Sequence, residues 1–208
     1  MRRFKVFLSA ILAGISIAIG GIAFLSSESK VIGALFFTVG LFTICSFGFH
    51  LFTGKVCYAP ENDGRYALDL VFIWLGNLAG AILTSLALRL TRVAPALIER
   101  AQALCEAKLS DHLISIFFLA FFCNLLIFIA VDGYKNFDSA LGRHLALFFG
   151  VTVFILCGFE HCVANMFYFA LAGSYTLQTL GYLLVMTCGN ALGGISLFLL
   201  KRFCTKKV

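Results

Sequence analysis

One short stretch of the chain carries the residue types that could do chemistry. Residues 158–166 read Gly-Phe-Glu-His-Cys-Val-Ala-Asn-Met, which places Glu160, His161 and Asn165 within six residues of one another inside a long apolar run. Ionisable and amide side chains are costly in such surroundings, so each is a candidate for function. A glycine opens the stretch, and apolar helical segments lie on both sides of it. This pattern predicts a broken membrane helix that lines a pore or a binding site. The alternative is a polar cluster that only joins helices.

Two other kinds of chemistry are conceivable for the same residues. Cys157, His161 and Cys162 are close enough to suggest a metal site, but the apolar context and Glu160 argue against one, and the chain has no Cys-x-x-Cys pair. His161 and Cys162 could form a catalytic pair, although adjacent residues rarely reach the geometry of a nucleophile and its base. We therefore expect no metal, no cofactor, no enzymatic activity and no disulfide.

The composition is that of an integral membrane protein. The chain has 208 residues, of which 61% are hydrophobic and 12% are charged, whereas soluble domains are about 45–50% apolar and roughly a quarter charged. A membrane helix needs about 20 apolar residues, so the chain has room for about six helices and no soluble domain. We expect residues 1–208 to form one all-α transmembrane domain in the lipid bilayer. The net charge of +6 does not indicate a nucleic-acid partner, because no run of Lys or Arg exceeds two residues.

Hydropathy and turn residues predict the elements that position this stretch. The first apolar run could be a signal peptide, but it reaches Leu25 without a clear cleavage site, so we interpret it as a retained helix. The amphipathic segment Arg89–Lys108 predicts an interfacial helix or a capped loop. Turns are expected at Ser26–Lys30, Lys55–Tyr66 and Asp132–Arg143. Membrane helices are expected at about Phe4–Leu25, Val31–Phe49, Ala67–Leu90, Lys108–Val131, Ala140–Leu171 and Thr176–Leu200.

Two pairs of repeated sequence motifs indicate the architecture. Gly76-Asn77-x-x-Gly80 matches Gly189-Asn190-x-x-Gly193 at an offset of 113 residues, and Gly48-Phe49-His50 matches Gly158-Phe159-Glu160-His161 at an offset of 110. The second and fifth helices therefore both contain a break, at 48–54 and at 158–164. Because each half has three helices, the second half must enter the membrane upside down. This predicts an inverted three-helix repeat, with copies at about 4–90 and 108–201, and a site near the midplane between the broken helices.

The basic residues predict the orientation of the chain. With both termini on one side, that side collects eleven Lys and Arg residues, against five on the other: Lys30, Arg89, Arg92, Arg100 and Lys108. The positive-inside rule then places both termini in the cytoplasm.

These motifs together resemble those of the formate/nitrite transporter family. The likeness rests on residues 158–166, on Leu-Phe-Thr-Gly at 51–54 and on the two Gly-Asn-x-x-Gly motifs, and it covers nearly the whole chain. It implies an aquaporin-like six-helix protomer in the inner membrane of a bacterium. It also implies a homopentamer with one pore per protomer, for small monovalent anions such as formate, nitrite or hydrosulfide and for the accompanying proton.

The resemblance also assigns roles to individual residues. His161 is similar to the family's pore histidine, and Thr53 to the threonine of the first break. Lys108 corresponds to the basic residue of the outer vestibule. Two hydrophobic constrictions are implied, an outer one at Phe37 and Phe154 and an inner one at Leu41, Leu51, Phe52 and Ile127. The polar groups that hold the broken loops are expected at Glu160, Asn165, Asn124, Asn77 and Asn190.

The chain departs from the family pattern in two places. It begins almost at the first helix, so the amphipathic amino-terminal helix typical of the family is nearly absent, which puts any gating by that helix in doubt. His50 stands where some relatives carry an acid, which adds a titratable group beside Thr53.

The apolar constrictions suggest how such a pore would work. A bare anion crosses a hydrophobic constriction at a high cost in free energy, whereas the neutral acid passes more readily. Lys108 would concentrate anions outside, and His161 would donate a hydrogen bond or a proton at the midplane; the sequence leaves open which. It also leaves open the anion, with formate as the first choice. A hydrosulfide-specific channel and an aquaporin-like pore for neutral solutes are the alternatives, although the paired Asn-Pro-Ala boxes of water channels are missing.

Overall fold

The computed structural model describes residues 2–205, and within them it contains only helices and the turns that join them, as predicted. Lys206 and Lys207, which were counted among the basic residues of the inner side, lie outside this range. The helices are α1 (Arg2–Ser26), α2 (Lys30–Phe47), α3 (Phe52–Val56), the 3-10 turn η1 (Ala59–Glu61), α4 (Gly64–Arg89), α5 (Ala94–Leu109), α6 (Leu113–Asn136), α7 (Ala140–Leu156), α8 (Cys162–Ala172) and α9 (Leu177–Thr205).

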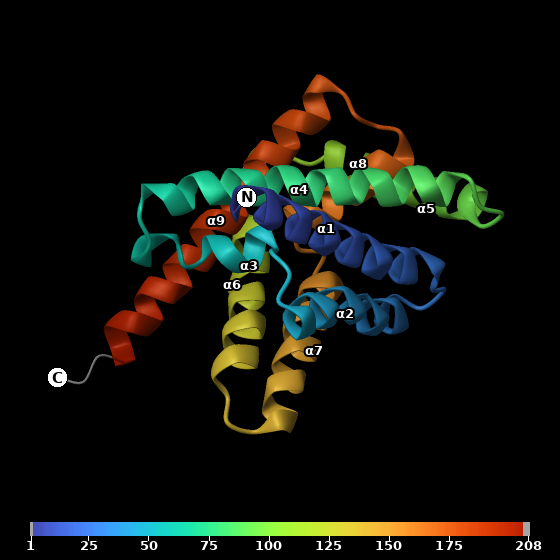
Figure 1. Cartoon of the computed structure of the whole chain (residues 1–208). Coiled ribbons are helices and arrows are strands. Elements are labelled where there is room, and N and C mark those ends of the chain that lie inside the picture. Colours follow the sequence, from blue (N-terminus) through green and yellow to red (C-terminus); the bar gives the residue numbers. More distant parts are fainter. Residues whose placement is uncertain (1, 206–208) are drawn as a thin grey trace.

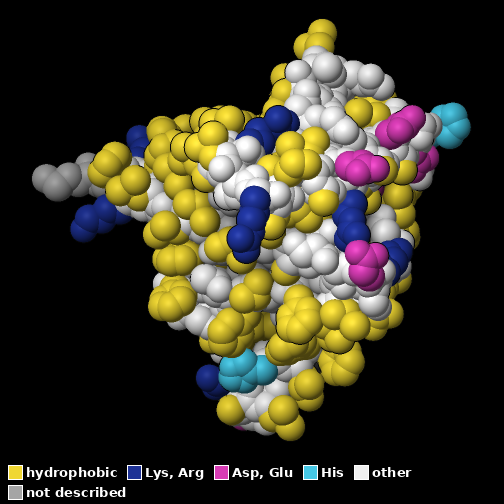
Figure 2. All heavy atoms as spheres, turned by 90° about the vertical axis from the view of Figure 1, so that its right-hand side faces the viewer, with side chains coloured by type: hydrophobic (Ala, Val, Ile, Leu, Met, Phe, Trp, Pro, Cys, Tyr) yellow, Lys and Arg dark blue, Asp and Glu magenta, His cyan; other side chains and the backbone are white. Residues whose placement is uncertain are grey.

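Most of these helices are built to cross a membrane. Five of the described helices, α1, α2, α4, α6 and α9, are long and apolar enough to span a bilayer, and α7 and α8 are shorter apolar helices. Many large hydrophobic side chains remain exposed along them, and Figure 2 shows such side chains covering much of one face, with charged groups gathered toward its upper and central part. An apolar surface of this extent is stable only against lipid or another protein surface.

Several boundaries differ from the sequence prediction, and three of them concern the two breaks and the residues around them. The second helix ends at Phe47 rather than near Phe49, because Gly48 has a φ of +72° and terminates it. Lys108 belongs to the last turn of α5 and does not begin the next membrane helix, which starts at Leu113. The loop expected over Asp132–Arg143 is shorter, because α6 continues to Asn136 and stabilises its polar end through the contact between Asp132 and Lys201.

The two halves of the chain pack in the same way. Helix α1 packs along α4 and against α2, and α6 packs along α9 and against α7. Figure 1 shows α1 beside α4 and the α6–α7 pair as a hairpin. The two copies meet where α2 packs on α7 and where α8 packs on α4, and α8 also packs against α5. This is the predicted six-helix plan, with the second and fifth membrane helices each divided in two.

Glycines allow the paired helices to touch backbone to backbone. A Cβ atom on Gly80 of α4 would lie 2.2 Å from the Ile11 carbonyl oxygen of α1, and one on Gly193 of α9 would lie 2.1 Å from the Phe121 carbonyl oxygen of α6. Because residues 11 and 121 differ by 110 and residues 80 and 193 by 113, the two crossings are copies of one another. Small residues at helix crossings are the usual means of close approach in membranes.

We predict that Gly193→Ala strongly destabilises the fold. The added methyl group would overlap a main-chain carbonyl that cannot move aside, and overpacking of this kind costs about 1–3 kcal/mol or more. The measurement is thermal unfolding of the purified protein in detergent. Gly181→Ala is the matched control, because Gly181 lies in the same helix and a Cβ there meets nothing within 4 Å. Equal stability of the two variants would contradict the close contact.

Candidate functional site

The first break, at residues 48–51, is held by one buried asparagine. Asn77 of α4 accepts a hydrogen bond at Oδ1 from the Phe52 N–H (2.9 Å), which is the first amide of α3. Its Nδ2 donates to the carbonyl oxygens of Ala10 (2.8 Å) and His50 (2.9 Å). The bonds to Phe52 and His50 satisfy backbone groups that the break removes from the helical ladder, and the bond to Ala10 ties the break to α1. In an apolar medium each unsatisfied group would cost several kcal/mol.

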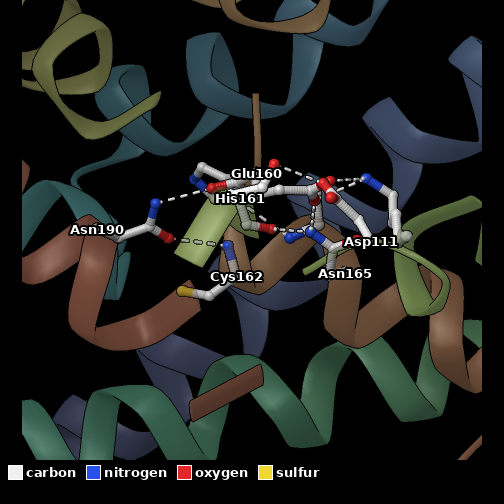
Figure 3. Close-up of polar contacts among 9 residues, drawn as sticks. Asp111, Glu160, His161, Cys162, Asn165 and Asn190 are labelled. Atoms are coloured by element: carbon white, nitrogen blue, oxygen red, sulfur yellow. Dashed lines mark hydrogen bonds and ion pairs between the residues drawn. The ribbon is translucent and has the colours of Figure 1, made fainter. Parts of the chain in front are cut away.

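The second break, at residues 157–161, is held by an equivalent asparagine. Asn190 of α9 accepts at Oδ1 from the Cys162 N–H (2.9 Å), the first amide of α8. Its Nδ2 donates to the carbonyl oxygens of Ala120 (2.7 Å) and Glu160 (2.8 Å), as Figure 3 shows for the labelled residues. Gly158, with a φ of +70°, turns the chain here as Gly48 does in the first break. Each partner lies 110 residues after its counterpart, so the repeat extends to individual hydrogen bonds.

The two breaks bring His161 and Thr53 together at the buried centre of the molecule. The Nε2 atom of His161 lies 2.9 Å from the Thr53 hydroxyl, and both side chains are almost completely buried. The other ring nitrogen, Nδ1, accepts a hydrogen bond from the Ala164 N–H (3.1 Å) and so caps the amino terminus of α8. A neutral imidazole has one proton. In this arrangement that proton lies on Nε2 and is donated to Thr53.

Aromatic and aliphatic side chains enclose the His161–Thr53 pair. Phe154 of α7 stacks on the His161 ring with 5.7 Å between ring centroids, and it meets Phe37 of α2 edge to face at 6.0 Å. Leu41 and Leu51 are also buried, and both line a pocket on the other side of the pair. A polar pair between two apolar layers can bind a small permeant and exclude a hydrated ion.

A pocket reaches the centre from each side. The Lys108 pocket, of about 110 Å³, includes Phe37, Phe154, His161 and Asn165 in its lining. The Lys55 pocket, of about 290 Å³, has Leu41 and Leu51 in its lining together with three basic side chains, Lys55, Lys135 and Arg143. The two pockets have no lining residue in common: His161 lines the Lys108 pocket, and Leu51 and Gly54, close to Thr53 in the chain, line the Lys55 pocket.

Two residues expected at the inner constriction are placed differently from Leu41 and Leu51. Phe52 lines an apolar hollow on another side of α3, together with Leu70, Val71 and Trp74. Leu51 precedes α3 in extended backbone and Phe52 is the first residue of the helix, so the two side chains point in different directions, and only Leu51 lines the Lys55 pocket. Ile127 is buried in the hydrophobic core. Neither Phe52 nor Ile127 is among the residues that line the Lys55 pocket.

Lys108 is bound to the second break rather than free in its pocket. Its Nζ atom donates to both carboxylate oxygens of Glu160, at 2.7 and 2.6 Å, and the side chains are only 12% and 4% exposed. The charge expected to attract anions is therefore matched by a buried carboxylate. Asn165 adds to this group, because its Nδ2 donates to Glu160 (2.8 Å) and to the His161 carbonyl oxygen (3.0 Å).

The remaining polar residues support the breaks. Asn165 Oδ1 is a buried acceptor without a hydrogen-bond partner among the described residues, in a side chain that lines the Lys108 pocket. Asn124 of α6 donates from Nδ2 to the Thr53 carbonyl oxygen (3.1 Å) and so supports α3. In the first break, His50 donates its backbone N–H to the Ser9 hydroxyl (3.2 Å), and its Nδ1 finds no partner in the part of the chain that the structure describes.

This geometry agrees with the comparison to known families. The family model described as formate/nitrite transporter matches residues 1–203. The chain belongs to the formate/nitrite transporter family. Its relatives are channels and transporters, and this confirms the prediction of a membrane transport protein rather than an enzyme.

Individual formate/nitrite transporter relatives are moderately similar. The uncharacterized transporter YrhG of Bacillus subtilis is 32% identical over 81% of this chain and 68% of its own length. A probable formate transporter of Methanothermobacter thermautotrophicus is 27% identical over 91% and 84%. Among solved structures, a pentameric formate channel with formate bound superposes with a TM-score of 0.80 at 25% identity, over 98% of this chain and 96% of that one.

Sequence reasoning missed what fixes α5 beside the second break. Arg100 donates to the carbonyl oxygens of Leu25 (2.8 Å) and Ser27 (3.2 Å), which ties α5 to the turn after α1. The amphipathic pattern of residues 89–108 predicted the helix. The pattern did not indicate that Arg100 binds the carbonyl groups of Leu25 and Ser27, because this contact depends on how segments far apart in the sequence pack together.

The turn between α5 and α6 keeps the adjacent Lys108 in place. The Tyr182 hydroxyl donates to the carbonyl oxygens of Leu109 (3.2 Å) and Asp111 (2.8 Å). The Asp111 carboxylate accepts hydrogen bonds from the Ser115 hydroxyl (2.6 Å) and from the His112 N–H, which hold the pKa of this exposed carboxyl below its usual value.

We predict that Lys108→Met destabilises the protein by about 3–5 kcal/mol, because it leaves the Glu160 carboxylate buried without its cation. The double variant Lys108→Met/Glu160→Gln should recover most of this loss. The check is chemical unfolding in detergent. Arg202→Met is the control, because its ion pair with Glu61 (2.9 Å) is much more exposed and such pairs contribute at most about 1 kcal/mol. A double variant as unstable as Lys108→Met would show that Lys108 acts through other contacts.

Proposed function

We propose that this chain is one subunit of a homopentameric channel that passes small monovalent anions, formate first, across the cytoplasmic membrane. Each subunit would contain its own pathway, from the Lys108 pocket through the His161–Thr53 pair to the Lys55 pocket. The observation that carries the proposal is the buried hydrogen bond between His161 and Thr53, with apolar side chains and a pocket on either side of it.

The two pockets suggest what crosses the centre. Unpaired charge in an apolar passage is very costly, so the species that passes between Phe37 and Phe154 is expected to be the neutral acid. The Lys108 charge is matched by Glu160, and Asn165 Oδ1 in the same pocket is an acceptor without a hydrogen-bond partner among the described residues. Lys30, which also lines this pocket, donates to the Leu156 carbonyl oxygen (3.0 Å). An acceptor such as Asn165 Oδ1 suits a permeant that carries a proton. A monovalent anion accompanied by a proton fits this chemistry.

The hydrogen bonds of His161 favour one of its two possible roles. Nδ1 is occupied by the Ala164 N–H, and the proton on Nε2 points to Thr53. The Thr53 hydroxyl keeps its own hydrogen and can donate a hydrogen bond to the permeant. If His161 were to release a proton, the ring would first need a second proton on Nδ1, which would break the cap of α8. We therefore propose that His161 polarises Thr53 as a hydrogen-bond donor, and that the anion takes up its proton from the solution before it enters the constriction as the neutral acid.

The location and assembly follow from the family and the charge distribution. The solved relative is a pentamer with formate bound, which supports both the pentamer and the choice of anion for this chain. The excess of basic residues on the side that holds both termini supports a cytoplasmic location for them. Nitrite and hydrosulfide remain the other substrates to test, because the buried pair selects by size and basicity.

The proposed function is tested by anion uptake into liposomes that contain the purified full chain. Formate, nitrite and hydrosulfide are compared with and without an inward proton gradient. We expect formate uptake that the gradient increases, because the neutral acid crosses the centre. Uptake of hydrosulfide alone would assign a different substrate to the same pathway, and water flux without anion flux would contradict the proposal.

We further predict that Thr53→Val reduces formate flux roughly two- to tenfold, because a hydrogen bond to a neutral permeant contributes about 0.5–1.5 kcal/mol. Thr38→Val is the matched control, since the Thr38 hydroxyl is also buried but has no hydrogen-bond partner among the described residues. Flux is measured at constant pH in the same liposomes. Equal flux in the two variants would contradict the role of Thr53.

The two possible roles of His161, hydrogen-bond donor and proton donor, are distinguished by how formate flux responds to the proton gradient. Asparagine at this position can still cap α8 but cannot titrate. His161→Asn is expected to lower formate flux and to keep the increase caused by the proton gradient, because the permeant takes up its proton from the solution and not from His161. Loss of that increase would show that His161 itself transfers the proton.

A further inference from the structure

The Lys55 pocket carries more positive charge than the proposed function requires. Lys55 lies in α3, Lys135 near the end of α6 and Arg143 in α7, so three separate elements bring a cation to one cavity of about 290 Å³. Among residues 2–205, no acidic side chain is part of the lining. Three cations so close together repel one another, and a single monovalent anion would neutralise only one of them.

The three cations are largely uncommitted. Arg143 donates its Nε–H to the Phe137 carbonyl oxygen (2.6 Å), which leaves both terminal amino groups of its guanidinium available. Lys135 lies over the Tyr58 ring, with its Nζ 4.3 Å from the ring centroid. For Lys55 the structure gives no side-chain hydrogen bond or ion pair within residues 2–205. By contrast, Lys108 in the other pocket is fully engaged by Glu160.

The floor of the Lys55 pocket would stop a highly charged ligand. Leu41 and Leu51 close the pocket toward the buried pair, and both are almost completely inaccessible. A multiply charged anion could enter the pocket but could not be desolvated through this apolar floor. The cavity therefore has the shape and charge of a binding site rather than of a passage for such a ligand.

We propose that the Lys55 pocket binds a phosphate-type oxyanion with two or more negative charges, which blocks this end of the pathway. The guanidinium of Arg143 suits two oxygens of one such group, and the two ammonium groups suit the remaining charge. The inference deepens the proposed function, because it assumes that the pocket is one mouth of the pathway. The oxyanion is either free phosphate or the phosphate group of an anionic lipid.

Binding is tested on the purified full chain in neutral detergent at constant ionic strength. One arm adds inorganic phosphate and the other adds a short-chain phosphatidic acid, each compared with chloride. Thermal unfolding should shift upward by a few degrees with at least one of them, because a ligand that binds the folded state stabilises it. A shift with phosphate identifies a soluble ligand, and a shift with the lipid alone identifies a headgroup. No shift in either arm overturns the proposal.

The site is assigned by matched charge changes. Lys55→Gln should weaken oxyanion binding roughly tenfold or more, measured by titration calorimetry, because it removes a charge-assisted contact. Arg65→Gln is the control: it removes the same charge from the predicted cytoplasmic side, and Arg65 does not line the pocket. Equal weakening by both variants would mean that binding reflects only the net charge of the protein. It would overturn the assignment of the binding site to the Lys55 pocket.

The block is tested separately from binding. Formate flux into liposomes that contain wild-type protein should fall when the same oxyanion is present on both sides, and Lys55→Gln should relieve the inhibition. If formate flux is absent throughout but binding depends on Lys55, the proposed function fails while the binding site stands. If flux is present but the oxyanion does not reduce it, the proposed block fails.

Discussion

The structure depends on one constraint, which is that a chain broken inside an apolar medium must satisfy its backbone polar groups. Asn77 and Asn190 meet it in the same way, each with one accepted and two donated hydrogen bonds to main-chain groups. Each asparagine joins a break to the helix behind it, so the half-helices α3 and α8 begin at fixed points. Because the beginnings of α3 and α8 lie close together, Thr53 and His161 meet at the buried centre of the molecule.

The same constraint explains why His161 is both a structural and a candidate functional residue. It occupies the position before α8, where a helix needs an acceptor for its first free amides, and one ring nitrogen serves that need. The other nitrogen is then committed to be a donor toward Thr53. The requirement for a cap at a helix end thus selects the tautomer at the centre. Glu160, Lys108 and Asn165 complete this arrangement by fixing the loop from behind.

Much of the fold was predictable because its causes are local or repeated. Length and hydropathy located the membrane helices, and the two pairs of repeated motifs located the breaks and the asparagines that support them. The placement of Phe52 and the engagement of Lys108 were not predictable. The first depends on the direction of a helix of only five residues, and the second on a carboxylate 52 positions away in the sequence. The three cations of the Lys55 pocket, at 55, 135 and 143, were visible in the sequence only as a count of charges on one side.

The glycine crossings have a further consequence for the whole frame. At Gly80 and Gly193 one main chain lies directly on another, a geometry that permits weak Cα–H···O contacts between the helices. The spacing of α1 from α4, and of α6 from α9, is therefore set by backbone dimensions and not by the volumes of neighbouring side chains. Lipid-facing positions can then exchange one apolar residue for another without moving the helices. The frame tolerates wide divergence of sequence, provided that a few positions never acquire a side chain.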